Sequence, residues 1–92
     1  MEPTQRGISR DAAVASSERA EPIGAYLRRQ RTLREITLEQ LSEATRIPLR
    51  SLQRLESGAF DREPDGFARA IVRTVAIALG LPPDETVARM LP

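Results

Sequence analysis

The stretch T-L-E-Q-L-S-E-A-T-R-I-P-L-R-S-L-Q-R-L-E-S-G, residues 37–58, holds two short amphipathic segments joined by a brief turn. Its large apolar side chains fall where two helices at a steep angle point them into one small core: Leu38, Leu41, Ile47, Leu52 and Leu55. Thr37, followed by Gln40, fits a capping box that begins a helix over residues 38–44. A second helix opens at Pro48 and ends at Gly58, the residue type that most easily takes a left-handed C-terminal conformation. This spacing predicts a helix-turn-helix, a unit whose second helix can enter the major groove of DNA.

The apolar pattern predicts three further helices around this unit. One covers residues 22–33, with Ile23, Tyr26 and Leu27 on its buried side. Another covers residues 67–79 and is expected to bury the series Phe67, Ile71, Val75 and Leu79. A short last helix over residues 84–91 turns Val87 and Leu91 inward, while Met90 and Leu91 are either a cap on the core or a contact between two copies. We therefore predict an all-α fold, a compact five-helix bundle that contains the helix-turn-helix.

The domain is expected to cover residues 21–92, preceded by a tail. Residues 1–20 contain few large apolar side chains and show no lasting helical or strand period. Such a segment cannot bury enough surface to offset the entropy of ordering it, so the sequence predicts a disordered N-terminal tail. The alternative is a short arm that adds phosphate contacts through Arg6, Arg10 and Arg19.

The composition favours a binding module over an enzyme. The chain has no Cys and no His, which excludes disulfides, thiol catalysis, the commonest zinc ligands and imidazole acid–base chemistry. No glycine-rich phosphate-binding loop is present, so we expect no cofactor, no metal and no small-molecule substrate. No run approaches the roughly 18 apolar residues that a membrane span needs, and the N-terminus lacks the apolar core of a signal peptide. A cytoplasmic protein is the expectation.

The net charge of +1 is distributed unevenly along the chain. Residues 28–54 contain seven Arg against three Glu, which is +4, whereas the rest contains seven Arg against ten acidic residues, which is −3. A local positive excess over a helix-turn-helix is what attraction to phosphate requires. The alternative is that these arginines only solvate the surface of a small helical domain.

The candidate DNA contacts lie mainly on the helix that opens at Pro48. Arg50 and Arg54 are one turn apart on its outward side; Arg suits bidentate contact with guanine, and Gln suits adenine. Backbone N–H groups at the start of the preceding helix can meet a phosphate. The predicted DNA-binding residues are Arg50, Ser51, Gln53, Arg54, Leu49, Thr37, Gln40, Arg46, Arg28 and Arg31. Alternatives remain: Arg50 and Arg54 are solvated or pair with Glu43 or Glu56, Thr37 is only a cap, and Leu49 contacts a thymine methyl, a protein partner or the core rim.

Residues 22–91 resemble a known family. Leu41, Leu52 and Leu55, together with L-E-S-G at 55–58, are similar to the Cro/repressor-like (XRE) domains, which have five helices. Within that family the chain most resembles the cytoplasmic N-terminal domain of RodZ-type proteins. That likeness rests on T-R-I at 45–47, G-A-F-D at 58–61, Pro64, F-A-R-A-I-V-R at 67–73 and L-G-L at 79–81.

The resemblance implies two different functions. In repressor relatives the third helix reads DNA bases, which implies a small transcriptional regulator that binds double-stranded DNA, with a homodimer on an inverted repeat as a further possibility. In RodZ relatives the domain precedes a membrane span and binds an actin-like filament protein through the fourth helix, which implies an adaptor whose partner contacts include Phe67, Arg69 and Arg73.

Four residues bear on these family patterns: Arg46, Phe67 and Val75 depart from them, and Glu56 follows them. Arg46 occupies the turn position that repressors usually give to Gly. Phe67 and Val75 stand where RodZ relatives have tyrosines. The family motif also makes Glu56 a structural acid near the end of its helix.

Overall fold

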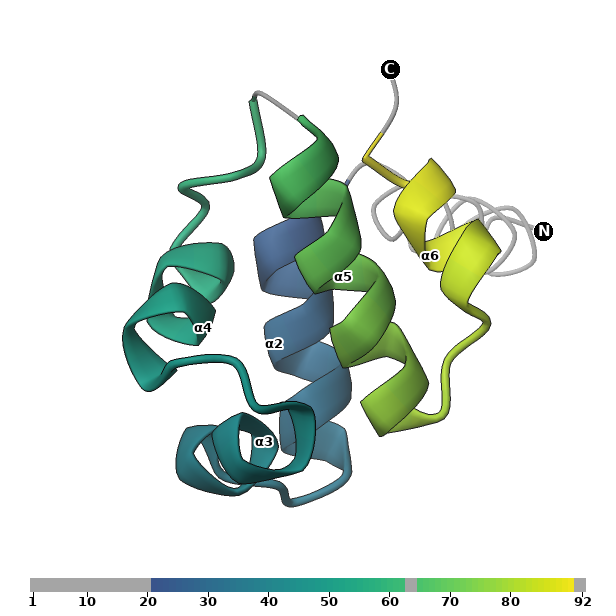
Figure 1. Ribbon diagram of the computed structural model, residues 1–92. Helices are drawn as coiled ribbons and strands as arrows, with labels where there is room; N and C mark the ends of the chain where they lie inside the picture. Colours follow the sequence, from purple (N-terminus) through teal and green to yellow (C-terminus); the bar gives the residue numbers. More distant parts are fainter. Residues whose placement is uncertain (1–20, 63–64, 91–92) are drawn as a thin grey trace, which may run out of the picture.

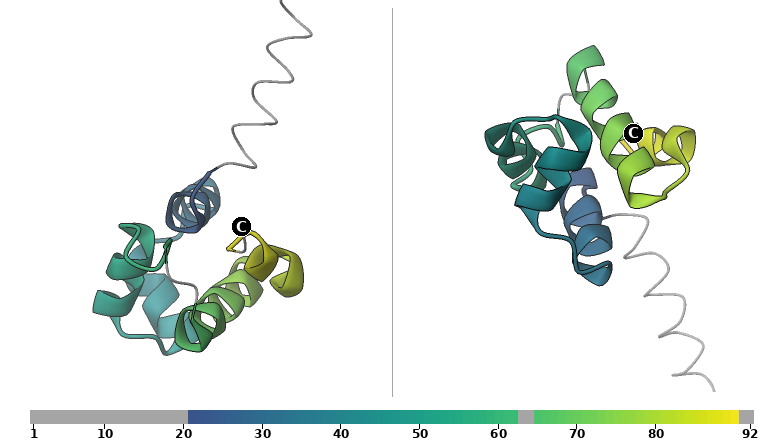
Figure 2. Two further views of the ribbon diagram at one scale, coloured as in Figure 1. Left: turned by 90° about the horizontal axis from the view of Figure 1, so that it is seen from above. Right: turned by 60° about the horizontal axis from the view of Figure 1, so that its bottom comes forward.

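The computed structural model describes residues 21–62 and 65–90, and these residues form helices without any strand. The helices are α2 (Ile23–Leu33), α3 (Leu38–Thr45), α4 (Leu49–Glu56), α5 (Gly66–Leu79) and α6 (Pro83–Ala88). The prediction of an all-α, five-helix body is confirmed for this part of the chain, whereas the tail predicted over residues 1–20 lies outside the described residues. Figures 1 and 2 show α5 between the helix-turn-helix, α3 and α4, on one side and α6 on the other.

The core is built from the apolar stripes of α2, α3, α4 and α5. One or two large side chains of each of these helices are almost completely buried: Leu27, Leu41, Leu52, Leu55, Val72 and Val75. Ile36, Leu38, Ile47 and Phe60 pack against this cluster from the connecting segments and from the start of α3. Because the two helices of the helix-turn-helix share this core with α2 and α5, their crossing angle is set by side-chain packing on both sides.

The prediction that Phe67 is buried is wrong. Its side chain is 61% exposed, although Ile71, Val75 and Leu79 of the same expected series are buried. The buried side of α5 is centred on a neighbouring row that also contains Ala68, Val72 and Ala76. Phe67 therefore lies at the edge of the stripe, where its ring meets Phe60 edge-on instead of entering the core.

The C-terminal segment also differs from the prediction. The last helix ends at Ala88, and two backbone bonds, from Arg89 N–H to the Thr86 carbonyl and from Met90 N–H to the Val87 carbonyl, turn the chain back. Met90 is consequently only 7% exposed and closes the core, so it is not available as a dimer contact. Val87 packs against the core as expected, whereas Leu91 lies outside the described residues.

A close contact between α2 and α4 fixes how the helix-turn-helix meets the rest of the bundle. Gly24 faces the end of α4 so closely that a Cβ at this position would lie 2.3 Å from the Leu55 carbonyl oxygen. The Gly24 N–H also donates to Asp61 Oδ1 at 3.0 Å, which satisfies an amide at the start of α2 that has no partner within its own helix. Position 24 therefore requires glycine, because any side chain there would clash with the Leu55 carbonyl.

We expect Leu52→Ala to be among the most damaging truncations in the protein. The Leu52 side chain is completely buried, so its removal leaves a cavity and costs about 2–5 kcal/mol of the free energy of unfolding. Urea unfolding measures the loss, and Leu33→Ala is the control, because Leu33 is 66% exposed and its truncation should cost little. A midpoint for Leu52→Ala equal to that of the parent would contradict the packing described.

Gly24→Ala should destabilise the protein, whereas Gly66→Ala should not. The first places a methyl group against the Leu55 carbonyl and should cost about 1–3 kcal/mol through overpacking. The second meets no heavy atom within 4 Å and should be neutral or stabilising by roughly 0.4–1 kcal/mol, because Ala has less conformational freedom than Gly in the unfolded chain. Thermal unfolding of both variants checks the pair. Equal midpoints would show that α2 and α4 can separate without cost.

Candidate nucleic-acid interface

The first helix of the helix-turn-helix begins with the predicted capping box. Gln40 N–H donates to Thr37 Oγ1 at 3.0 Å, and Thr37 N–H donates to Gln40 Oε1 at 2.9 Å. The interpretation of Thr37 as a cap is confirmed. The amide group of Gln40 still carries two N–H donors, and the backbone N–H groups of Leu38 and Glu39 have no partner within the helix.

The turn between α3 and α4 is held by side chains that the sequence analysis did not single out. Ser42 Oγ donates to the Ile47 carbonyl at 2.6 Å, and Thr45 Oγ1 donates to the Leu41 carbonyl at 2.7 Å. Thr45 Oγ1 also accepts from Ile47 N–H at 3.2 Å. Hydroxyl side chains near a helix end commonly bond to the local backbone, so this signal was present in the sequence.

Arg46 takes a left-handed conformation in this turn, with φ of 62° and ψ of 20°. Such a conformation is costly for any residue with a Cβ, and the hydrogen bonds of Ser42 and Thr45 hold the chain on either side of Arg46. The Arg46 side chain is exposed beside the start of α4. The turn thus accepts an arginine at a position whose backbone favours glycine.

The outward side of α4 presents Arg50, Gln53 and Arg54, all exposed, while Leu52 and Leu55 are buried as predicted. Ser51 and Leu49 are half-buried at the edges of this surface. Within residues 21–62 and 65–90, no carboxylate forms an ion pair with Arg50 or Arg54. The predicted alternative of pairing with Glu43 or Glu56 is therefore not what the structure contains. Arg54 instead lies over the ring of Phe60, with 5.5 Å between the guanidinium carbon and the ring centroid.

Arg31 differs from the arginines of α4 because its side chain is engaged by the fold. Its Nε and Nη2 groups donate to the Glu56 carboxylate at 2.7 and 2.9 Å, and its Nη1 group donates to the Ile36 carbonyl at 2.7 Å. The hydrogen bond to Glu56 raises the pKa of Arg31 despite the opposing effect of burial. Glu56 thus links α2 to α4 as a structural acid, and we leave Arg31 out of the interface.

The positive excess over residues 28–54 divides into two groups of arginines. Arg29 pairs with Glu21 at 2.9 Å, and Arg34 donates to the Leu79 carbonyl at 2.7 Å, so these two serve the fold together with Arg31. The other four side chains are exposed and form no ion pair with a carboxylate in residues 21–62 and 65–90: Arg28, Arg46, Arg50 and Arg54. Sequence reasoning gave the total charge of this segment correctly but had no means of separating the two groups.

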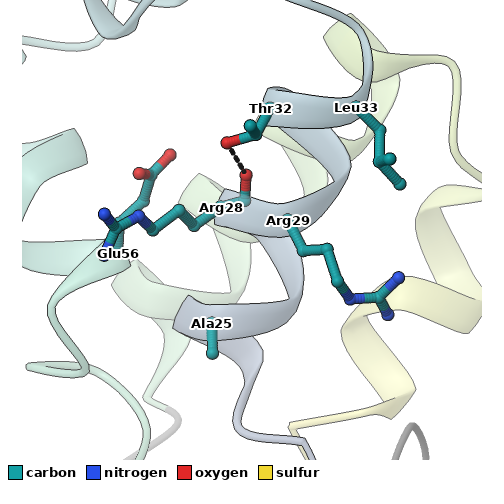
Figure 3. A pocket seen from close by; sticks show the side chains of 6 residues that line it. All are labelled: Ala25, Arg28, Arg29, Thr32, Leu33 and Glu56. Carbon is teal, nitrogen blue, oxygen red and sulfur yellow. Dashed lines mark hydrogen bonds between the residues drawn. The ribbon is translucent and has the colours of Figure 1, made fainter.

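An open pocket of about 370 Å³ lies on the outer side of α2. Figure 3 shows Arg28 extending toward Glu56 at the end of α4, whereas Arg29 and Leu33 extend away from Glu56. The Thr32 hydroxyl donates to the Arg28 carbonyl at 2.8 Å, a bond within α2 that leaves the Arg28 guanidinium uninvolved. The Arg28 side chain therefore lies on the side of α2 that faces the end of α4.

The three residues predicted for a protein partner lie on α5. Phe67 is exposed, Arg73 Nη1 pairs with Asp84 Oδ1 at 2.6 Å, and Arg69 is exposed with contacts of its own. Ile77, which the sequence analysis did not name, is also 61% exposed on this helix. The outer side of α5 therefore carries two large apolar groups.

The described part of the chain contains no group of three or more acidic, Cys or His side chains placed to hold a metal ion. None of its helices is both long and apolar enough to cross a membrane.

Comparison with known protein families gives a match to the model of a helix-turn-helix domain over residues 26–86, which is more than half of the chain. No curated protein and no solved structure shows a significant match. The matched range contains the capping box, the turn and the outward side of α4 described above. The chain therefore belongs to this family of helix-turn-helix domains.

Proposed function

We propose that the protein is a non-catalytic, sequence-preferring DNA-binding module, a small transcriptional regulator that lays α4 in the major groove. The observation that carries this proposal is the outward side of α4, where Arg50, Gln53 and Arg54 are exposed side by side. In a helix-turn-helix this is the surface that meets base edges. Arginine and glutamine there match the acceptors of guanine and the mixed donor and acceptor pattern of adenine.

The surrounding residues supply candidate phosphate contacts. Arg46 follows α3 in the turn and has an exposed, unpaired guanidinium within the described residues. Thr37 and Gln40 bring the amide donors at the start of α3, and Arg28 adds a charge on α2 beside the end of α4. Such contacts position a protein on the duplex without reading its sequence, which is the part we assign to these residues. Ser51 and Leu49 complete the interface at the edge of α4.

A homodimer on an inverted repeat is part of the proposal. Two half-sites one helical turn apart would bring two copies of α4 to successive major grooves on one side of the duplex. Because Met90 is buried, such a dimer would need another surface of the domain.

The second candidate is a protein-binding adaptor of the RodZ kind, with a cytoskeletal protein such as an actin-like filament as its partner. The exposed Phe67 and Ile77 on α5 favour it, since large apolar side chains at 61% exposure are common in protein interfaces. Arg69 and Arg73 lie between them in the sequence of the same helix. This candidate differs from the first in the helix that carries the function.

We expect Arg50→Ala and Arg54→Ala each to lose about 1–3 kcal/mol of binding free energy on a duplex selected by the parent from a random pool, and to lose preference for that duplex. Binding by the parent should weaken steeply with salt, with a slope of log affinity near −0.9 for each phosphate neutralised. Fluorescence anisotropy across a salt series, with selected and random duplexes, measures both quantities.

The matched control is Ile77→Ala, an exposed change on α5 that should leave DNA affinity unchanged. If α5 carries the function, Ile77→Ala should instead weaken a protein complex while the α4 variants retain it. An absence of duplex binding by the parent at about 50 mM salt, where electrostatic binding is strong, would exclude the DNA proposal.

Arg46→Gly should change stability and DNA affinity in opposite directions. Glycine relieves the left-handed strain and should stabilise the fold by about 1 kcal/mol. Removal of the charge should weaken binding to all duplexes alike and reduce the salt slope by about 1. Thermal unfolding and the same salt series are the measurements. Because the variant is more stable, weaker binding cannot arise from unfolding; unchanged affinity and slope would remove Arg46 from the interface.

A further inference from the structure

Arg54 differs from the other arginine of the outward α4 surface in having an aromatic neighbour. Its guanidinium carbon lies 5.5 Å from the centroid of the Phe60 ring, within the range of roughly 6 Å over which a cation is attracted to an aromatic face. Arg50, one turn earlier on the same surface, has no aromatic ring or carboxylate beside it in the described parts of the chain. The two side chains therefore differ in how many rotamers they can adopt before any ligand is bound.

The Phe60 ring is itself held in place. Its inner side packs against the core, and Phe67 meets it edge-on, with 6.1 Å between the ring centroids and 83° between the ring planes. Edge-to-face geometry of this kind is a favourable arrangement of two rings. Phe60 thus presents a fixed aromatic surface to Arg54.

The loop that carries Phe60 is fixed on both sides of the ring. Ala59 N–H donates to the Arg54 carbonyl at 3.0 Å, which joins the loop to the last turn of α4. On the other side, Asp61 Oδ1 accepts from Gly24 N–H at the start of α2, and Asp61 N–H donates to the Gly58 carbonyl at 3.1 Å. The backbone beside Phe60 is therefore tied to the same helix whose arginine the ring contacts.

We propose that Phe60 is a positioning residue for DNA recognition, which holds the Arg54 guanidinium in the orientation from which it contacts a base edge. This inference rests on the proposed DNA-binding function and adds a residue that does not itself contact DNA. A long arginine side chain loses rotamer freedom when it binds, and contact with a ring before binding removes part of that loss. Sequence preference at the base pair below Arg54 then depends on Phe60, whereas preference at the base pair below Arg50 does not.

A double-mutant cycle tests the proposal. Phe60→Leu keeps an apolar side chain on the core but removes the aromatic face, and Phe60→Tyr keeps the face. In the parent and in the Arg50→Ala background, Phe60→Leu should weaken binding to the selected duplex about 2- to 10-fold, as expected for the loss of one exposed cation–π contact and its preorganisation. In the Arg54→Ala background it should have no effect, and Phe60→Tyr should bind like the parent. Unfolding curves establish the temperature at which every variant is folded.

An equal loss in the Arg54→Ala background would show that Phe60 acts only through the fold and would overturn the proposal, as would a parent-like affinity of Phe60→Leu. If the parent binds DNA but the cycle shows no coupling between Phe60 and Arg54, this inference alone is wrong. If the parent binds no duplex, the proposed function is wrong as well.

An NMR measurement on the parent, both free and bound to DNA, keeps the test decisive if Phe60→Leu does not fold. The ring current of Phe60 should displace the NMR signal of the Arg54 Nε proton upfield from that of Arg50, and saturation with a selected duplex should not abolish the displacement. Coincident Arg54 and Arg50 signals in the parent would show that no positioning takes place.

Discussion

The contact between α2 and α4 at Gly24 is the constraint on which the rest of the structure depends. Only a residue without a Cβ allows the Leu55 carbonyl to approach this closely, and the approach sets the distance between the two helices. Asp61 and the Arg31–Glu56 ion pair then fix the end of α4 against α2. With its inner side held in this way, α4 presents its other side to solvent in a defined orientation.

The arginines of this protein have two roles, and the role of each depends on the group that its side chain contacts. Arg31 is half-buried against Glu56, and Arg34 donates to the carbonyl at the end of α5, so both side chains hold helices together. Arg50 on α4 lies in solvent, where its charge is available to a ligand. Because guanidinium groups can form several hydrogen bonds in one plane, the same side chain suits both tasks. The net charge of a segment therefore gives its total positive charge but does not show which arginines can attract a ligand.

The two candidate functional surfaces are physically connected. Phe67, on the α5 surface considered for a protein partner, contacts Phe60, and Phe60 contacts Arg54 on the α4 surface considered for DNA. A protein bound over Phe67 would alter the environment of the ring beside Arg54. For this reason Ile77, which lies further along α5, distinguishes the two functions better than Phe67 does.

Local rules in the sequence determined the helices, the capping box at Thr37, the left-handed conformation of Gly58, and the apolar stripes that supply most of the core. These features arise from interactions within one or two helical turns, which a single sequence reveals. The exposure of Phe67, the burial of Met90, the pairing of Arg31 with Glu56 and the bond from Gly24 to Asp61 were decided by the tertiary structure alone. Each of them depends on which helix lies opposite. The burial of a side chain at the edge of an apolar stripe, and the acceptor that an arginine contacts, are fixed only when the helices pack together.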